Sequence, residues 1–185
     1  MQSKLLALVF AFASAASVWA SPLEAGTICK GQVTVSTSYI GKDHNVKVEQ
    51  VTCPDAQSLQ PVTGLEARQA SNVCGATCNT NCFTPSGGGP NPNECHVITD
   101  ALKFESENTG PTFTIGTGAI NTIVMTYLSC KTFFVNQDVS TLSYCRNDWA
   151  SLVDIVAFDC QAPQNAHGGN CVAADGRWFV QVQHS

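Results

Sequence analysis

Charged residues are scarce in this sequence. Asp, Glu, Lys and Arg make up 12% of its 185 residues, whereas an average soluble domain contains about 25%. No cluster of Lys or Arg occurs and the net charge is −5, so the chain lacks the positive patch that nucleic acids and anionic membranes require. We therefore expect neither as a partner. The polar surface must consist of uncharged side chains, which suits neutral, hydroxyl-rich ligands.

Several catalytic motifs are absent as well. The chain has no Gly-x-Ser-x-Gly element of a serine hydrolase. Its glycine run at 87–89 lacks the Gly-Lys-Ser/Thr of a phosphate-binding loop. Asp154 and Asp159 stand five residues apart on an expected helix. They would not face one cleft, as the two carboxylates of a glycosidase do.

Histidine is also rare, with four residues in the chain. None stands at the spacing of a metal site from another, so we expect no metal and no cofactor. A small hydrolase or nuclease could use His96, His167, Glu94 and Arg146. Structural roles explain these residues better, with Glu94 capping a helix, His96 on its solvated face and His167 in a loop. The sequence therefore predicts a protein without catalytic activity.

A strongly apolar run occurs only in the first twenty residues. Lys4 supplies a positive charge, residues 5–16 form the apolar stretch, and Val18-Trp19-Ala20 fits a cleavage site. This pattern predicts a signal peptide at 1–20 and a secreted, extracellular protein. No later run is long enough to span a bilayer, so membrane insertion is not expected.

Cysteine, by contrast, is abundant, with ten residues. In an oxidising compartment, an even number in a small chain normally forms disulfides. We therefore predict disulfides rather than metal ligands, although the C-x3-C spacing at 74–82 would also fit zinc. The predicted disulfide cysteines are Cys29, Cys53, Cys74, Cys78, Cys82, Cys95, Cys130, Cys145, Cys160 and Cys171.

Two pieces follow the expected signal. Residues 21–68 contain two alternating apolar–polar runs separated by Gly41-Lys42-Asp43, which predicts a hairpin. Cys29 and Cys53 bracket this hairpin and are expected to pair with each other. A linker follows, and Arg68 in the run L-E-A-R-Q leaves two interpretations open, a plain linker or the processing site of a pro-segment.

Residues 69–185 are expected to form one cysteine-rich domain. Asn91, Pro92 and Glu94 fit the N-cap, the first turn and the capping-box position of a helix. Strand-like runs occupy residues 120–136 and 177–183, and the latter ends near the C-terminus. The order of helices and strands predicts an α+β domain with an antiparallel sheet against two main helices.

The second helix is expected from Ser140 to Cys160, capped by Asp138 or Ser140. Its apolar stripe includes Cys145 and Trp149, which we assign to the core. Cys145 and Cys160 would lie about 22 Å apart on this helix, whereas a disulfide needs α-carbons within about 7 Å. Each must therefore bond another segment. The three cysteines at 74–82 and Cys171 are the natural partners, and the full pairing stays open.

The last strand supplies the candidate site. Trp178 alternates in phase with two valines and is assigned to the core, which places Phe179, Gln181 and Gln183 on the opposite face. An aromatic ring beside amide groups can stack on a sugar ring and bind its hydroxyls. A strand face covered by a helix or a partner would show the same pattern.

The loop before this strand extends the candidate site. Residues 165–170 contain His167 and Asn170 and are held by Cys171. Their imidazole and amide groups are expected to lie beside the strand face and to complete a glycan-binding site.

Four stretches resemble a known fungal family: residues 94–102, 127–136, 142–160 and 168–182. The family is that of the small mushroom lectin called glycan-binding protein Y-three, and the resemblance covers about residues 72–185. It implies a disulfide-bonded α/β/α sandwich that binds glycans, including ones that contain N-acetylgalactosamine, without catalysis. Residues 21–67 lie outside the resemblance.

The sequence thus predicts a secreted, lectin-like protein whose partners are glycans. Single sites of this kind bind weakly, so strong binding to cells would need a homodimer or several sites. Two alternatives stay open. One is a toxin or effector with a protein target, since the layout is also similar to the killer toxins of smut fungi. The other is the small hydrolase or nuclease discussed above.

Overall fold

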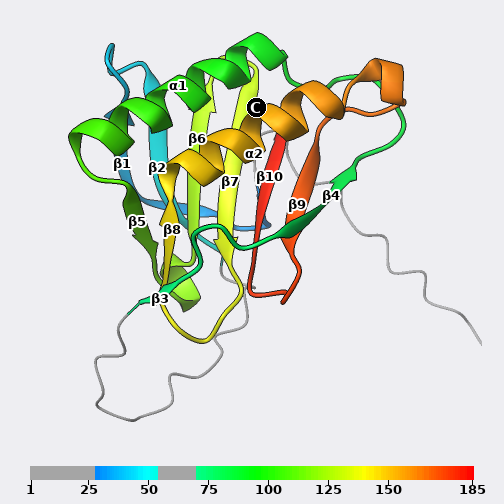
Figure 1. The fold of residues 1–185 in the computed structure, drawn as a ribbon. Coiled ribbons are helices and arrows are strands. Elements are labelled where there is room, and N and C mark those ends of the chain that lie inside the picture. Colours follow the sequence, from blue (N-terminus) through cyan, green and yellow to red (C-terminus); the bar gives the residue numbers. More distant parts are fainter. Residues whose placement is uncertain (1–27, 54–69) are drawn as a thin grey trace, which may run out of the picture.

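The computed structural model describes residues 28–53 and 70–185 of the chain (Figure 1). The expected signal peptide at 1–20 and the segment around Arg68 lie outside the described residues. A seven-stranded sheet forms the centre, and all its pairings are antiparallel. In spatial order its strands are β1 (Val33–Ile40), β2 (Val46–Thr52), β6 (Thr122–Tyr127), β7 (Cys130–Asn136), β10 (Trp178–His184), β9 (Gly169–Ala173) and β4 (Cys78–Cys82).

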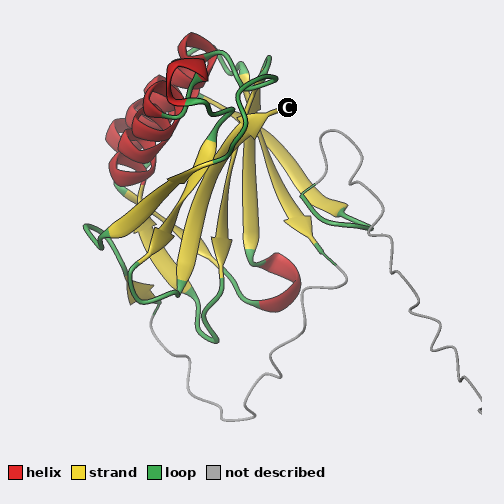
Figure 2. Cartoon of the chain, turned by 90° about the vertical axis from the view of Figure 1, so that its right-hand side faces the viewer, coloured by secondary structure: helices red, strands yellow, loops and turns green. Residues whose placement is uncertain are grey.

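Two helices cover one face of this sheet, as Figures 1 and 2 show. They are α1 (Pro92–Asn108) and α2 (Arg146–Asp159), and two short 3-10 helices span Gly118–Ile120 and Ala162–Gln164. A small second sheet has the order β3 (Ser71–Asn72), β8 (Leu142–Cys145) and β5 (Thr112–Ile115). The predicted α+β class and antiparallel sheet are confirmed. Because both helices lie on the same face, the three-layer arrangement of an α/β/α sandwich is not confirmed.

The main core lies between the large sheet and the helices. Trp149 and Trp178 are fully buried in it, as predicted from their periodicity. The Trp178 ring stacks on Phe134 at 5.4 Å between centroids, and the indole N–H of Trp149 donates to the hydroxyl of Thr132 at 3.1 Å. A smaller apolar cluster of Val51, Val124 and Phe133 packs separately.

Helix α1 begins at the predicted residue, but its first turn differs in detail. The Asn91 side chain accepts a hydrogen bond from the backbone N–H of Asn93 at 3.0 Å, so Asn91 is the N-cap. The Glu94 carboxylate accepts from the backbone N–H of Ser129 at 2.8 Å and from its hydroxyl, and the Ser129 hydroxyl accepts from the Asn91 N–H. Ser129 thus stands between the two members of the expected capping box. These bonds hold the pKa of Glu94 below its ordinary value.

The predicted start of the second helix at Ser140 was wrong. Residues Leu142–Cys145 form β8 and the helix begins at Arg146, with Cys145 rather than Asp138 or Ser140 as N-cap. Leu142 and Tyr144 are buried while Ser143 is half-buried, which is the alternation of a strand. Leu142 and Cys145 are also three residues apart, which is a helical step. The predicted apolar stripe of the helix therefore included residues that belong to β8.

All ten cysteines are bridged, as predicted. Cys29 pairs with Cys53 within the hairpin, as expected. The other four pairs are Cys74–Cys145, Cys78–Cys171, Cys82–Cys160 and Cys95–Cys130. Cys145 and Cys160, at the two ends of the second helix, thus bond two of the three cysteines at 74–82, and Cys171 bonds the third.

The predicted hairpin forms as β1 and β2 and joins the large sheet, because β2 pairs with β6. Its turn lies close to α1. Gly41 has φ +88°, and a Cβ at this position would lie 2.9 Å from the Cβ of Ala101. Only glycine fits this approach without strain.

Candidate functional site

The face of the large sheet that points away from the helices is called the outer face here. In β10, Trp178, Val180 and Val182 are buried in the core beneath the helices. The alternate residues Phe179 and Gln181, like Gln183 after them, are half-buried and point the other way. Neither α1 nor α2 covers this face, because both lie on the opposite side of the sheet (Figure 2).

Strand register brings four of the five predicted site residues to this face. Asn170 of β9 lies directly opposite Gln181 of β10, and Val172 lies opposite Phe179. Gln183 follows Gln181 on the same face. The fifth residue, His167, precedes β9 and has different neighbours.

His167 lies against the segment after β4. Its Nδ1 contacts the carbonyl of Pro85, and its backbone N–H donates to the Phe83 carbonyl at 3.0 Å. The ring centroids of His167 and Phe83 lie 6.1 Å apart. The contacts that fix its ring are therefore with residues 83–85 and not with Phe179 or the glutamines.

The structure adds two residues that the sequence reasoning missed. Strand β4 pairs with β9 so that Asn81 lies opposite Asn170 and Asn79 opposite Val172. Both asparagines are exposed. Both lie between the cysteines of residues 78–82, whose spacing indicates cross-links and not a binding surface. The alternation in C-N-T-N-C is the signal that could have revealed a strand.

The amide groups of this face are only partly engaged with one another. The Asn81 amide donates to Oδ1 of Asn170 and to the Asn79 carbonyl, both at 3.2 Å. The Gln181 amide donates to Oε1 of Gln183 at 2.6 Å. Within the described part of the chain, the other amide atoms of these side chains make no hydrogen bond. Those atoms are Oδ1 of Asn81, Nδ2 of Asn170, Oε1 of Gln181 and Nε2 of Gln183.

Phe179 provides an apolar surface beside these amides. Its ring meets Phe133 edge to face at 6.2 Å between centroids, and it packs on the small cluster of Val51, Val124 and Phe133. Because this packing fixes one side of the ring while the residue stays half-buried, Phe179 is a rigid element of the surface.

The acid–base candidates of a hydrolase are not gathered into one site. Glu94 bonds Ser129, and Arg146 donates from Nε to the Gly110 carbonyl at 3.0 Å. His96 of α1 pairs with Asp154 of α2 at 2.9 Å. The hydroxyl of Thr99 donates to the same carboxylate oxygen at 2.9 Å, so this group joins the two helices.

One group of side chains has metal-like spacing among the described residues. Ligand atoms of Cys74, Cys145 and Asp148 lie within 4.8 Å of one another. The two sulfurs form a disulfide, so they are not thiolates that could bind a metal. Asp148 accepts the backbone N–H of Gly75 at 2.7 Å and thereby fixes the turn after β3.

A pocket of about 520 Å³ lies between the β1–β2 turn and α1. Phe104 and Tyr127 are half-buried parts of its wall, and charged side chains of both signs, such as Lys42 and Glu107, surround it. It shares no residue with the outer-face site.

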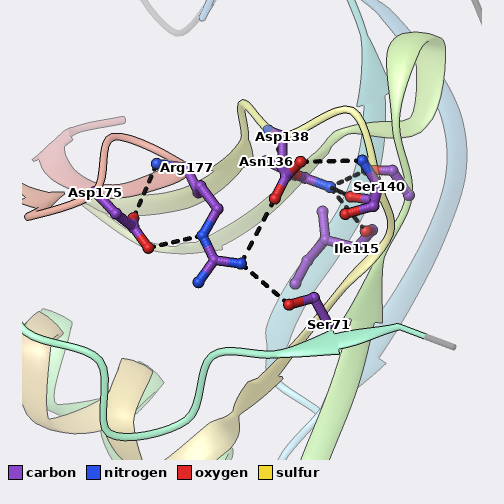
Figure 3. A network of polar contacts seen from close by, with 8 residues as sticks. Ser71, Ile115, Asn136, Asp138, Ser140, Asp175 and Arg177 are labelled. Atoms are coloured by element: carbon purple, nitrogen blue, oxygen red, sulfur yellow. Dashed lines mark hydrogen bonds and ion pairs between the residues drawn. The ribbon is translucent and has the colours of Figure 1, made fainter.

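A polar network lies at the end of the sheet near β3 (Figure 3). Arg177 binds Asp175 at 2.7 Å and Asp138 at 3.6 Å, and it donates to the Ser71 hydroxyl at 3.0 Å. The buried Asn136 donates to backbone carbonyls, among them those of Ile115 and Ser140 in Figure 3. Hydrogen bonding to Asp175 raises the pKa of Arg177. The network joins the loops at this end of the sheet and is structural.

Comparison of the chain with models of protein families, with curated proteins and with solved structures gives no match. Among the described residues, neither helix combines the length and apolar character needed to cross a membrane. The five disulfides fit an oxidising compartment.

Proposed function

We propose that the protein is a secreted, lectin-like protein that binds neutral glycans on its outer face without turning them over. The observation that carries the proposal is the set of amide atoms of Asn170, Gln181 and Gln183 that bond no described residue, beside the half-buried ring of Phe179. The resemblance to the Y-three family supports the same function and adds N-acetylgalactosamine-containing glycans as ligands.

Sugar recognition needs this combination of groups. Hydroxyls require directional partners, since an unpaired buried hydroxyl costs about 1–3 kcal/mol. Asparagine and glutamine amides supply both donors and acceptors. The C–H face of a pyranose gains from contact with an apolar surface, which Phe179 supplies. None of these side chains carries a charge, which matches a neutral ligand.

The test is a glycan array with the secreted wild-type protein, followed by titration of a bound glycan against two site variants. Gln181→Ala should lose most of the binding, because the amide that meets a hydroxyl is removed. Phe179→Leu keeps an apolar side chain against Phe133 but lacks the aromatic face, so we expect weaker binding with retained folding.

Two controls lie on the opposite side of the molecule. Phe158→Ala and Asn147→Ala change an exposed aromatic and an exposed amide of α2, and both should bind like wild type. Equal binding by wild type and both site variants would place the glycan elsewhere. An array without any bound glycan would refute the function itself.

A further inference from the structure

We propose that the ligand of the outer face is a linear, neutral oligosaccharide of at least three residues that crosses strands β10, β9 and β4. A single terminal sugar would not engage all of this surface. This inference rests on the function proposed above and specifies its ligand. It follows from two rows of side chains that run across the three strands.

The first row consists of amides. Gln181, Asn170 and Asn81 lie directly opposite one another on neighbouring strands. Adjacent strands lie about 4.8 Å apart, so the row spans about 10 Å. That span exceeds one pyranose ring. Successive sugars of an extended chain can therefore each meet one amide.

Each position of this row keeps an amide atom that bonds no described residue. These atoms are Oε1 of Gln181, Nδ2 of Asn170 and Oδ1 of Asn81. A hydroxyl can both donate and accept. Each position of the row can thus bind a hydroxyl of a neighbouring sugar.

The second row is apolar in β10 and β9. Phe179 and Val172 lie opposite each other, two residues along their strands from Gln181 and Asn170. The two rows are therefore about 7 Å apart. A chain that lies along them turns its C–H faces toward Phe179 and Val172 and its hydroxyls toward the amides.

Asn79 continues the second row in β4, where it lies opposite Val172. The third position therefore offers two amides, Asn79 and Asn81, and no apolar side chain. We expect recognition there to depend on hydrogen bonds alone.

Strand β4 forms the far end of this surface and is held rigidly. The Cys78–Cys171 disulfide joins it to β9, and Cys82–Cys160 joins it to the end of α2. A strand that is fixed before binding loses little conformational freedom when the ligand arrives. β4 is also the edge of the sheet, so a long glycan can extend past it.

The test is calorimetric titration of the secreted protein with two neutral series of one to four residues, N-acetylglucosamine oligomers and cello-oligosaccharides. In at least one series the affinity should rise about tenfold or more from one residue to three, with little further gain at four. Equal affinity for the monosaccharide and the trisaccharide would overturn the inference while leaving the proposed function intact.

The Asn81→Ala variant tests the third position separately. It should reduce trisaccharide affinity to that of the disaccharide and leave monosaccharide affinity unchanged, whereas Asn147→Ala on α2 should change neither. An equal loss for all lengths would overturn the extended binding mode. If neither series binds, the inference fails, and an empty glycan array would then refute the proposed function as well.

Discussion

The two ends of the seven-stranded sheet are held together by different means. At the β4 end, disulfides join β4 to β9 and to the end of α2, and Cys74–Cys145 joins the preceding turn to the start of α2. At the β1 end, Cys29–Cys53 closes the hairpin on itself. Among the described residues, no disulfide links the hairpin to the rest.

The hairpin is held instead by strand pairing and by buried side chains. β2 pairs with β6 over Lys47 to Val51, and Val46 and Val51 are fully buried. β1 contributes little burial, since Val33, Val35 and Tyr39 are each 55% exposed.

The difference teaches where cross-links are needed. β4 is a short, polar strand, C-N-T-N-C, which buries too little apolar surface to hold its place. Disulfides replace that burial and leave its asparagines exposed on the outer face. The covalent links are thus concentrated at the end of the sheet that carries the proposed glycan site.

The largest effect is expected in the main core, where Trp149 of α2 packs against the central strand β7. Trp149→Ala should lower the free energy of unfolding by about 3–5 kcal/mol, because it leaves a large cavity under the sheet. Denaturant unfolding measures this change. Phe158→Ala on the same helix, where Phe158 is 48% exposed, should cost far less. Equal stability of Trp149→Ala and wild type would contradict the core assignment.

Removing disulfides compares the two ends directly. Cys82→Ala with Cys160→Ala should lower the global free energy of unfolding by about 2–4 kcal/mol. Cys29→Ala with Cys53→Ala should loosen the hairpin and leave the unfolding of residues 70–185 nearly unchanged. Thermal unfolding and limited proteolysis distinguish the two results. An equal loss of global unfolding free energy in both double variants would show that the two ends of the sheet do not differ in this way.

A smaller effect is expected where the hairpin meets the sheet. Val51→Ala removes two buried methyl groups and should weaken docking of the hairpin by about 1–3 kcal/mol. Hydrogen exchange should accelerate in β2 and not in β9. Uniform acceleration across both strands would show that the hairpin and the sheet unfold as one cooperative unit.

The smallest effect concerns pH. Hydrogen bonds from Ser129 lower the folded-state pKa of Glu94 below its ordinary value of 4.5, so the carboxylate stabilises the fold above that value. This contribution is lost as the pH falls through the folded-state pKa. Glu94→Gln should therefore flatten the acid side of the stability profile. An unchanged acid profile would show that the hydrogen bonds do not stabilise the ionised form.

Local signals in the sequence predicted much of the fold. A turn signal predicted the hairpin, and a capping residue predicted the start of α1 at Asn91. Periodicity predicted the burial of Trp149 and Trp178. Neighbouring residues determine all of these signals. β9 and the disulfide pairing depend on contacts between distant segments, so no local pattern could determine them. The boundary between β8 and α2 was missed because Leu142 stands at a helical three-residue step from Cys145, although it alternates with the buried Tyr144 as in a strand.

The candidate site was likewise predictable in part, where it depends on local alternation along one strand. Alternation along β10 identified Phe179, Gln181 and Gln183 as residues of one face. The partnership of Asn170 with Gln181 and the addition of Asn79 and Asn81 required the pairing of β4, β9 and β10. The contacts of His167 with residues 83–85 could not be seen without the path of that loop.

The central claim is that a neutral glycan binds on the outer face at the cross-linked end of the sheet. The most direct test is NMR titration of the isotopically labelled, disulfide-bonded protein with a glycan selected on the array. We predict chemical-shift changes that are concentrated in β10, β9 and β4, including the side-chain amides of Gln181, Asn170 and Asn81. Changes concentrated at the pocket between α1 and the β1–β2 turn, or no changes at all, would contradict the claim.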